Sequence, residues 1–386
     1  MDSTPAQHRT GPGTGPETGR GIGERELVFM LALLQALHAL AIDAMLPALG
    51  AIGQDLHISE PNHRQLIVGV FLFGLGLGTL FPGPLADRYG RRPVILACLA
   101  FYIVPMLACA LVTDFNTLIV LRGVQAVGCS GLAVVPSAII RDRFDGDRMA
   151  RLQSMISVIF MIVPMIAPTL GQAILDAAGW RWIFGLMALL GMAMAVWTWA
   201  RLPETLSDEH RQDALHLGEI GRNMGAIFTK RESIGYVVAS ALMLAAGWGF
   251  INSCQQLIAE HFGAGDRFPL AFALIAVSMS LASFVNARIV VRFGTRRVSH
   301  TALFAYIAAA AVQVWLAFSP HQTLWQFLPL MAFNMALVGF MGANFGAIAL
   351  QPFARTAGSA SSAQSFLRMM TASLIGSAIG QAFDGT

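Results

Sequence analysis

This sequence has few charged residues. Only 12% of its 386 residues are charged, about half of the ~25% usual in soluble globular domains, whereas 55% are hydrophobic and the mean hydropathy is +0.62. The charges that remain are clustered, and the stretches between clusters are long enough to cross a bilayer as helices, for which about 20 apolar residues suffice. We therefore expect one membrane domain in place of two or three soluble domains.

Cysteine patterns and catalytic motifs are also scarce. The four cysteines lie inside apolar segments without metal-like spacing, so we expect neither zinc nor disulfides: Cys98, Cys109, Cys129 and Cys254. The sequence contains no nucleophile–base grouping, Walker sequence or dinucleotide fingerprint. We expect no enzyme activity and no bound cofactor, and an active transporter without an ATP site must use an ion gradient.

The basic balance of the chain does not indicate nucleic acid. The net charge is +3 and the pI is about 8.9, but the basic residues sit in short loops between apolar segments, where membrane orientation explains them. Residues 1–24 are rich in glycine, threonine and proline, so we expect a disordered tail. No short apolar region ending in a cleavage site follows this tail, so a signal peptide is not predicted.

Eleven apolar segments predict eleven membrane-spanning helices. They are continuous runs, unlike the alternating segments of a β-barrel, and therefore predict an all-α integral membrane protein. The segments are about 26–50, 64–86, 93–112, 115–140, 150–176, 180–201, 235–259, 268–292, 298–318, 324–350 and 360–383.

The loops differ in basic residues, and this difference predicts the orientation. The loops after even-numbered segments hold seventeen arginines and lysines, whereas those on the other side hold only Arg64, Arg181 and Arg267. Basic loops stay in the cytoplasm. We therefore expect the N-terminus and the even-numbered loops to be cytoplasmic.

The sequence repeats itself across a polar linker. GPLADRYGRR at 83–92 recurs in degenerate form as ARIVVRFGTR at 287–296, which is 204 residues later. We predict a six-helix half at 25–201, a cytoplasmic linker with a surface helix at 202–234, and a second half at 235–386. Two parallel halves are typical of a transporter. The second half has only five predicted helices, so a twelfth helix is expected to be missing, and a chain ending at Thr386 would end in the periplasm.

Asp43 is the clearest candidate for chemistry. It lies inside the first apolar segment, in LHALAIDAMLPAL at 37–49. A charged carboxylate in the membrane costs at least about 2.5 kcal/mol, so an intramembrane aspartate is functional by default. The alternative without a functional role is that Asp43 lies near the end of its helix, in contact with periplasmic water. His38 precedes Asp43 on the same helix and either shares a proton path with it or only packs.

Two intramembrane arginines are further candidates. Arg122, in LIVLRGVQAVG at 118–128, carries a permanent charge that could hold Asp43 ionised or neutralise a substrate. Its alternative role is to orient its helix by binding backbone carbonyls. Arg368 either faces a cavity or snorkels toward the cytoplasm. Gln125 and Arg368 are therefore possible cavity residues, and several phenylalanines could supply apolar cavity walls.

A loop motif and a proline-containing helix complete the candidates. In GPLADRYGRRP at 83–93, the glycines allow a tight turn and a close helix approach, and the acidic group can bind a basic partner on the other half. This predicted gate comprises Gly83, Asp87, Arg88, Gly90, Arg91, Arg92 and Arg355. In the fifth segment, Pro164, Pro168 and Gly171 predict a bend that is either static or flexes during transport.

These motifs together resemble the major facilitator superfamily, and within it the drug:proton antiporters of the Bcr/CflA subfamily. GPLADRYGRRP at 83–93 is similar to the signature between helices 2 and 3, IDAMLPAL at 42–49 to the first-helix motif and LRGVQAVG at 121–128 to the helix 4 motif. IIRDRF at 139–144 and APTLGQ at 167–172 extend the resemblance over nearly all of residues 30–383. The helix 5 motif departs from the usual Gly-Pro-x-x-Gly-Gly, and Arg368 is unusual for helix 11.

The resemblance implies a fold, a partner set and a function. It implies two pseudo-symmetric halves of the major facilitator fold, in a bacterial inner membrane, acting as a monomer on a small-molecule substrate. It assigns proton coupling to Asp43 and Arg122, in exchange for export of small hydrophobic or amphipathic drugs. Two alternatives stay open, a facilitator-fold importer or exporter of a small metabolite and a truncated relative that does not transport.

Overall fold

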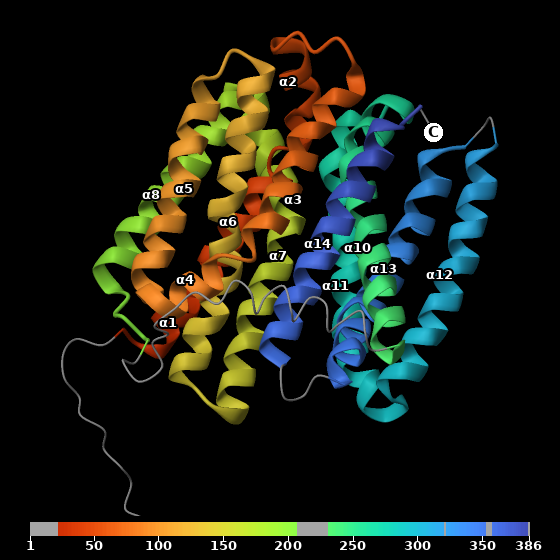
Figure 1. Ribbon diagram of the computed structural model, residues 1–386. Coiled ribbons are helices and arrows are strands. Elements are labelled where there is room, and N and C mark those ends of the chain that lie inside the picture. The colour runs from red at the N-terminus through yellow and green to blue at the C-terminus, as the bar shows by residue number, and fades with distance from the viewer. Residues whose placement is uncertain (1–21, 207–230, 320–321, 353–356, 385–386) are drawn as a thin grey trace, which may run out of the picture.

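A computed structural model describes residues 22–206, 231–319, 322–352 and 357–384 (Figure 1). In these ranges the chain forms helices and connecting turns without a strand, as the sequence predicts. Residues 1–21, 207–230 and 353–356 lie outside the described ranges. Three predicted features therefore lie wholly or largely outside the described residues. They are the N-terminal tail, the surface helix of the linker and Arg355.

The N-terminal helices are those that precede the linker. They comprise α1 (Glu24–Asp43), η1 (Leu46–Ala48), α2 (Leu49–Asp55), η2 (Pro61–Gln65), α3 (Leu66–Gly78), α4 (Pro82–Tyr89), α5 (Arg91–Leu111), α6 (Phe115–Arg143), α7 (Gly146–Ala178) and α8 (Trp180–Arg201). Within this group α5 packs against α6 and α8, α3 packs against α6, and α1 packs against α7.

The C-terminal helices follow the linker. They comprise α10 (Arg231–Gln255), the π-helical η4 (Gln256–His261), η5 (Gly265–Arg267), α11 (Phe268–Phe293), α12 (Thr295–Ala317), α13 (Leu324–Leu350) and α14 (Ala357–Gln381). The two groups stand side by side, and α14 lies where they meet, packed against both α10 and α3 (Figure 1). A second contact joins α7 to α11.

Length and composition support most of the predicted spans. In the described part of the chain, nine helices are long and apolar enough to cross a bilayer. A tenth is possible where Pro61–Gly78 and Pro82–Tyr89 form one span bent by 43°. The predicted eleventh, α14, is 25 residues long but is not among them. Its sequence carries several serines together with Gln364 and Arg368.

One local structure repeats where the sequence repeats. Gly90 ends α4 and begins α5 with φ 103° and ψ 155°, and Gly294 ends α11 and begins α12 with φ 81° and ψ 145°. Residues with a side chain rarely adopt this positive φ, so glycine is what allows two helices to join through a single residue. These two glycines occupy the same place in the two copies of the repeated motif.

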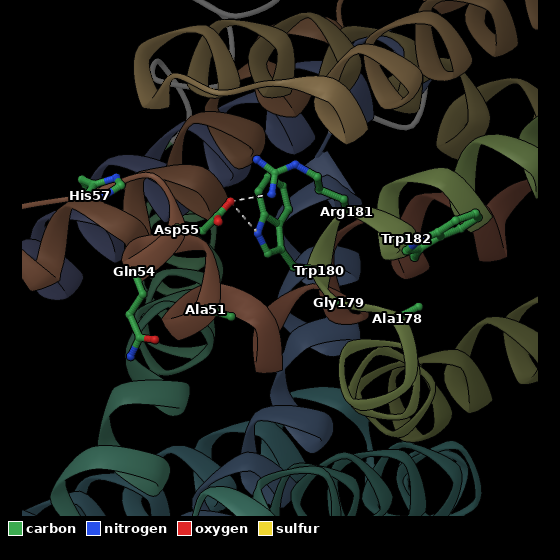
Figure 2. Close-up of a pocket in the computed structure, with 9 residues that line it drawn as sticks. All are labelled: Ala51, Gln54, Asp55, His57, Ala178, Gly179, Trp180, Arg181 and Trp182. Atoms are coloured by element: carbon green, nitrogen blue, oxygen red, sulfur yellow. Dashed lines mark hydrogen bonds and ion pairs between the residues drawn. The ribbon is translucent and has the colours of Figure 1, made fainter.

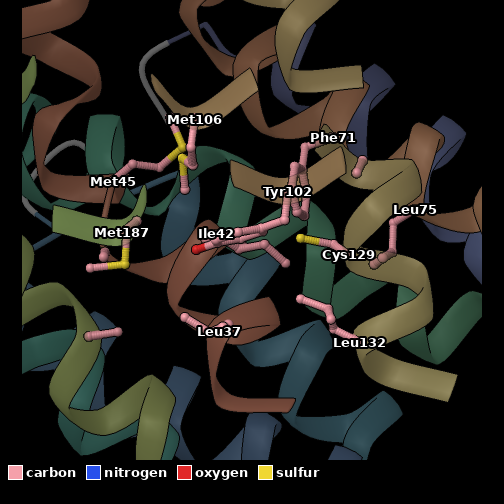
Figure 3. Close-up of a cluster of buried hydrophobic side chains, with 14 of the residues drawn as sticks. Leu37, Ile42, Met45, Phe71, Leu75, Tyr102, Met106, Cys129, Leu132 and Met187 are labelled. Atoms are coloured by element: carbon pink, nitrogen blue, oxygen red, sulfur yellow. The ribbon is translucent and has the colours of Figure 1, made fainter. Parts of the chain in front are cut away.

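A large part of the buried core lies among α1, α3, α5 and α6. Ile42 of α1 meets Tyr102 of α5, Phe71 of α3 and Cys129 of α6, all fully buried or nearly so (Figure 3). Apolar side chains fill the space around them. This packing fixes the end of α1 and thereby the residue that follows Ile42, which is Asp43.

Candidate functional site

The first span, Glu24–Asp55, is one helical run whose regular α-helix is interrupted after Asp43, and we call this interruption the break. The α-helix ends at this residue, two residues make a turn, and the chain resumes as the short helices η1 and α2. Pro47 explains the break, because a proline inside a helix removes a hydrogen-bond donor and clashes with the preceding turn. Broken helices inside a membrane are tolerated where protein surrounds the freed backbone. Asp43 therefore sits at an interruption in a buried helix.

Asp43 is buried and has no polar partner in the part of the chain that the structure describes. Only 5% of its surface is exposed, and no hydrogen bond or ion pair joins its carboxyl group to another described residue. Cys254 of α10 lies near it, across the interface between the two helix groups. The acid thus stands where the N-terminal helices meet the C-terminal helices. His38, five residues earlier, is buried and stacks on Phe160 of α7, and its Nε2 has no partner among the described residues.

Arg122 binds the backbone near Asp43 and not the Asp43 carboxylate. Its guanidinium donates to the Ala41 carbonyl oxygen at 3.1 Å and the Ile67 carbonyl oxygen at 3.4 Å. It also donates to Gln125 Oε1 at 2.7 Å and lies 4.2 Å from the centroid of the Phe71 ring. Fully buried, it joins α1, α3 and α6 at the break. A direct ion pair with Asp43, one of the predicted roles, does not form between these two described residues.

Helix α7 contributes a close contact to the same break. Gly171 lies so near the backbone of Ala44 that a Cβ at this position would collide with the Ala44 carbonyl oxygen. Pro164 and Pro168 lie within α7, which runs unbroken from Gly146 to Ala178. Helices α1, α6 and α7 thus converge on the interruption after Asp43, and the predicted role of the prolines in bending stays a prediction.

Polar contacts between the two helix groups gather at the end of the molecule where α2 and η2 lie. We call this the α2 end. Asn62 donates to the backbone oxygens of Gln381 at 3.0 Å and Phe383 at 2.8 Å, and Gln381 Nε2 donates to the Asn62 backbone oxygen at 2.7 Å. Gln256 Nε2 donates to Asn62 Oδ1 at 3.1 Å, and Gln65 donates to Gln256.

An ion pair and a hydroxyl group complete these contacts. Arg64 Nη2 lies 2.6 Å from Glu260 Oε1, and Ser373 Oγ donates to the Gly69 oxygen at 3.2 Å. Together these hydrogen bonds and this ion pair tie η2 and the start of α3 to η4 and to the last turns of α14. The α2 end is therefore closed.

The predicted gating motif lies at the opposite end, which we call the α4 end. Arg91, only 4% exposed, pairs through Nη1 with Asp87 at 2.5 Å and through Nε with Asp142 of α6 at 2.7 Å. Glu204 accepts the backbone N–H groups of Arg91 at 2.8 Å and Arg92 at 3.1 Å, and thereby caps the start of α5.

These contacts give Asp87 a partner that the sequence did not predict, and the gating role of the motif stays a prediction. Asp87 pairs with Arg91 of its own motif and not with a described residue of the C-terminal helices, because Arg91 reaches it one helical turn away. The proposed partner Arg355 lies outside the described residues. A Cβ at Gly83 would meet nothing within 4 Å, so the close approach predicted there is not found. The tight turn is confirmed at Gly90, and Arg88 rests on the Tyr89 ring.

The structure separates Arg368 from the Asp43 site. Arg368 lies on α14, half-buried, beside Gly346 of α13 and one turn after the buried Gln364. Because Gly346 is near the α4 end of α13, Arg368 and Asp43 belong to different depths of the protein. Gln125, by contrast, is part of the Arg122 cluster, where its Nε2 has no partner among the described residues.

Comparison with known proteins agrees with this geometry. The sequence model of the Major Facilitator Superfamily matches residues 31–380. The chain belongs to the Major Facilitator Superfamily. It is therefore a multi-pass membrane transporter of small molecules and not an enzyme.

Relatives in this superfamily match along most of the chain. A bicyclomycin resistance protein homolog of Haemophilus influenzae is 28% identical over 91% of this chain and 88% of its own length. The multidrug resistance protein MdtL of Klebsiella pneumoniae is 30% identical over 88% and 85%. Among solved structures, a D-xylose-proton symporter has a TM-score of 0.70 at 14% identity, covering 92% of this chain and 90% of the other. A bacterial homolog of the lysosomal transporter Spinster also has a TM-score of 0.70, at 18% identity and 93% and 81% coverage.

A surface pocket of about 710 Å³ in this facilitator-fold protein is separate from the Asp43 site (Figure 2). It lies between the end of α2 and the turn that joins α7 to α8. Its polar centre is already paired, because Asp55 accepts from Arg181 at 2.5 Å and from Trp180 Nε1 at 3.2 Å. We interpret these contacts as a brace that ties α2 to the α7–α8 turn.

Sequence reasoning missed the closed α2 end and the cap of α5. Single amide residues such as Asn62 and Gln381 give no local pattern, and they meet only when the two helix groups are placed together. Glu204 could have been predicted from the sequence. It follows the sixth span on the side of the membrane where Gly90, Arg91 and Arg92 lie, and an acidic side chain stabilises the N-terminus of a helix. Asn252, Gln255 and Gln256 were a further usable signal, because they are amides at the end of an otherwise apolar segment.

Proposed function

We propose that this transporter exports small hydrophobic or amphipathic drugs across a bacterial inner membrane in exchange for protons. The observation that carries the proposal is Asp43, a buried carboxyl group without a partner among the described residues, at a break in the first span, facing the other helix group. A carboxyl group in this setting is a place where a proton can bind and leave. The names of the relatives, bicyclomycin resistance and multidrug resistance, support the substrate class.

The proposed orientation follows from the arginine count. The α4 end carries the basic loops and is cytoplasmic, and the α2 end is periplasmic. The N-terminus is then cytoplasmic. We propose that α14 also spans, as the eleventh helix, because it packs along α10 and α3 where the two groups meet. We further propose that the protein acts as a monomer, because the path between its two helix groups lies within one chain.

In this orientation the protein is sealed from the periplasm. Asn62, Gln65, Gln256, Gln381 and the Arg64–Glu260 ion pair close the α2 end, so Asp43 can exchange protons only with the other side. Opening of the α2 end exposes Asp43 to periplasmic protons. Binding of a proton and binding of drug then favour different conformations, which is the differential affinity that coupling requires.

Arg122 has a positioning role in this scheme. It ties the carbonyl of Ala41, two residues before Asp43, to α3 and α6. The Arg122 guanidinium therefore fixes the position of the break, and it does not neutralise the Asp43 carboxylate. Gly171 holds the other side of the same turn against α7. The break is therefore braced on both sides, and movement of α7 or α6 is transmitted to Asp43.

The test is a drug-susceptibility panel in an efflux-deficient bacterial host, with and without a protonophore. The wild-type protein is expected to confer resistance that the protonophore removes. Asp43→Asn is expected to insert normally in the membrane and to confer none, whereas Asp176→Asn, an exposed acid at the end of α7, is expected to behave as wild type. Full resistance in Asp43→Asn would overturn proton coupling through this residue, and uptake of a metabolite in place of efflux would favour the facilitator alternative.

A further inference from the structure

Arg368 is a charged side chain of the second helix group that has no partner among the described residues. Its guanidinium has five N–H donors, and no hydrogen bond or ion pair links it to any part of the chain that the structure describes. Its Nε is buried. Neither α13 nor α14 contains an aspartate or glutamate that could approach it. A charge inside a membrane protein without a partner is costly and marks a functional position by default.

A second donor accompanies it. Gln364 lies one turn earlier on α14, is only 3% exposed, and has an Nε2 without a partner in the described ranges. Residues four apart share one face of a helix, so both side chains point the same way. The two buried atoms without a partner, Arg368 Nε and Gln364 Nε2, are both hydrogen-bond donors, so a ligand at this site must supply acceptors.

The facing helix, α13, brings the two donors together at a glycine. Both side chains flank Gly346 of α13, from whose Cβ position Arg368 Nη1 lies 3.6 Å and Gln364 Nε2 lies 3.8 Å away. With only hydrogen in place of a side chain, Gly346 presents no group that competes for the donors. The pair lies toward the α4 end, because Gly346 is near the last residues of α13. The other face of α14 is used for packing, where Met369 and Met370 contact α3 at Gly76.

We propose that Arg368 and Gln364 form a binding site for a single anionic oxygen group, a carboxylate or phosphate, carried by an amphipathic ligand that reaches the protein from the α4 end. A guanidinium and an amide can donate together to such a group, and bidentate pairing of arginine with a carboxylate is among the strongest hydrogen-bonded contacts that proteins make. The apolar lining of the helices takes the remainder of the ligand. The proposal deepens the proposed function, on which it rests, by adding negatively charged amphipathic compounds to its substrates.

The ligand has two sources with the same chemistry, a free small molecule and an anionic lipid headgroup. Thermal unfolding of the purified full-length protein in detergent distinguishes them without any proton gradient. The probes are salicylate and its uncharged analogue salicylamide, at equal ionic strength, and mixed micelles with phosphatidylglycerol or phosphatidylcholine. The variants are Arg368→Met, Arg368→Lys and Gln364→Leu, and the matched control is Arg296→Met, an exposed arginine at the start of α12.

Salicylate or phosphatidylglycerol is expected to raise the unfolding temperature of the wild type and of Arg296→Met, and the uncharged counterparts are not. Affinity for the anion is expected to fall about tenfold or more in Arg368→Met, in keeping with the loss of a charge-assisted pair. A smaller fall is expected in Gln364→Leu and partial retention in Arg368→Lys. Without ligand, Arg368→Met is expected to be at least as stable as the wild type, because an unpaired charge has been removed.

The proposal would be overturned by equal shifts with salicylate and salicylamide, by a shift that survives in Arg368→Met, or by no shift with either anion in the wild type. A ligand-free Arg368→Met that unfolds well below Arg296→Met would also overturn it, since Arg368 would then be structural. Asp43→Asn is expected to keep the anion-dependent shift. Failure of this site and failure of proton coupling are thereby distinguishable.

Discussion

The guanidinium of Arg122 donates a 3.1 Å hydrogen bond to the carbonyl oxygen of Ala41, two residues before Asp43. The arginine therefore acts on the backbone that leads into the break and not on the carboxyl group itself. Ile67 and Gln125 accept its other hydrogen bonds, so that one buried side chain fixes three helices together. Substitutions of Arg122 are therefore expected to disturb the geometry of the break and not the neutralisation of a charge.

Replacement of Arg122 by lysine separates geometry from charge. The Arg122→Lys substitution would keep the positive charge, but the new ammonium group could not reach Ala41, Ile67 and Gln125 together, because it is a compact donor on a flexible stem. Each buried acceptor left without a donor costs about 1–3 kcal/mol. We expect drug efflux in inverted membrane vesicles to fall at least about tenfold. Efflux equal to wild type in Arg122→Lys, at matched protein levels, would show that charge alone suffices.

The contact of Gly171 with Ala44 gives a steric prediction. In Gly171→Ala, the new methyl group would collide with the Ala44 carbonyl oxygen, and overpacking of this kind costs about 1–3 kcal/mol. We expect a lower unfolding temperature and reduced efflux. Gly235→Ala is the matched control, because its Cβ would meet nothing within 4 Å and alanine favours a helix by up to about 1 kcal/mol. Equal stability of the two variants would contradict the close contact.

The closed α2 end can be probed through a natural thiol. Cys254 is fully buried beside this interface, and Asn252 and Gln255 nearby hold buried polar atoms without partners in the described part of the chain, which water would satisfy on opening. Glu260→Gln removes the Arg64–Glu260 ion pair, whose loss is worth about 1 kcal/mol. A change of that size shifts the open population about fivefold.

Labelling of Cys254 by a membrane-impermeant thiol reagent, applied from the periplasm, measures that population. In a background with Cys98, Cys109 and Cys129 replaced by alanine, labelling is expected to be several-fold faster in Glu260→Gln and in Gln256→Leu. Glu60 is exposed and its carboxylate forms no hydrogen bond or ion pair with the described residues, so Glu60→Gln is the control. Labelling of Glu260→Gln and Gln256→Leu no faster than that of the Glu60→Gln control would contradict the role of Glu260 and Gln256 in closing the α2 end.

Glu204 supplies a prediction about stability. Its carboxylate accepts the first backbone N–H groups of α5 at Arg91 and Arg92. Loss of a helix cap costs about 0.5–2 kcal/mol, so Glu204→Ala is expected to lower the free energy of unfolding by that amount. Denaturation of the purified protein, compared with Glu60→Ala, measures the difference. A change no larger than that of the control would mean that the contact does not stabilise the start of α5.

Hydropathy alone predicted much of the fold. The apolar segments predicted the helices closely, because a bilayer imposes their length and an apolar surface on them. The repeat at 83–92 and 287–296 likewise contains the two glycine turns, because positive φ restricts the choice of residue. The break after Asp43 was not predicted. Pro47 was visible in the sequence, but whether a proline bends or interrupts a helix depends on what packs around it.

The site was harder to predict than the fold. Burial of Asp43 and Arg122 followed from their apolar surroundings, yet their partners did not, because an arginine can satisfy itself on carbonyls as well as on carboxylates. The partner of Asp87 was not predicted either. The sequence suggested a basic residue of the other half, whereas Asp87 pairs with Arg91 of its own motif. Contacts across the two helix groups, such as Asn62 with Gln381, come from segments 319 residues apart and leave no local pattern.

Proton release on drug binding tests the central claim most directly. The purified protein, in weakly buffered detergent solution with a pH-indicator dye, receives the drug to which it gives the largest protonophore-sensitive resistance. We expect protons to be released from the wild type, and we expect Asp43→Asn to bind the drug without releasing any. Proton release of equal size from Asp43→Asn would contradict the assignment of the coupling proton to Asp43.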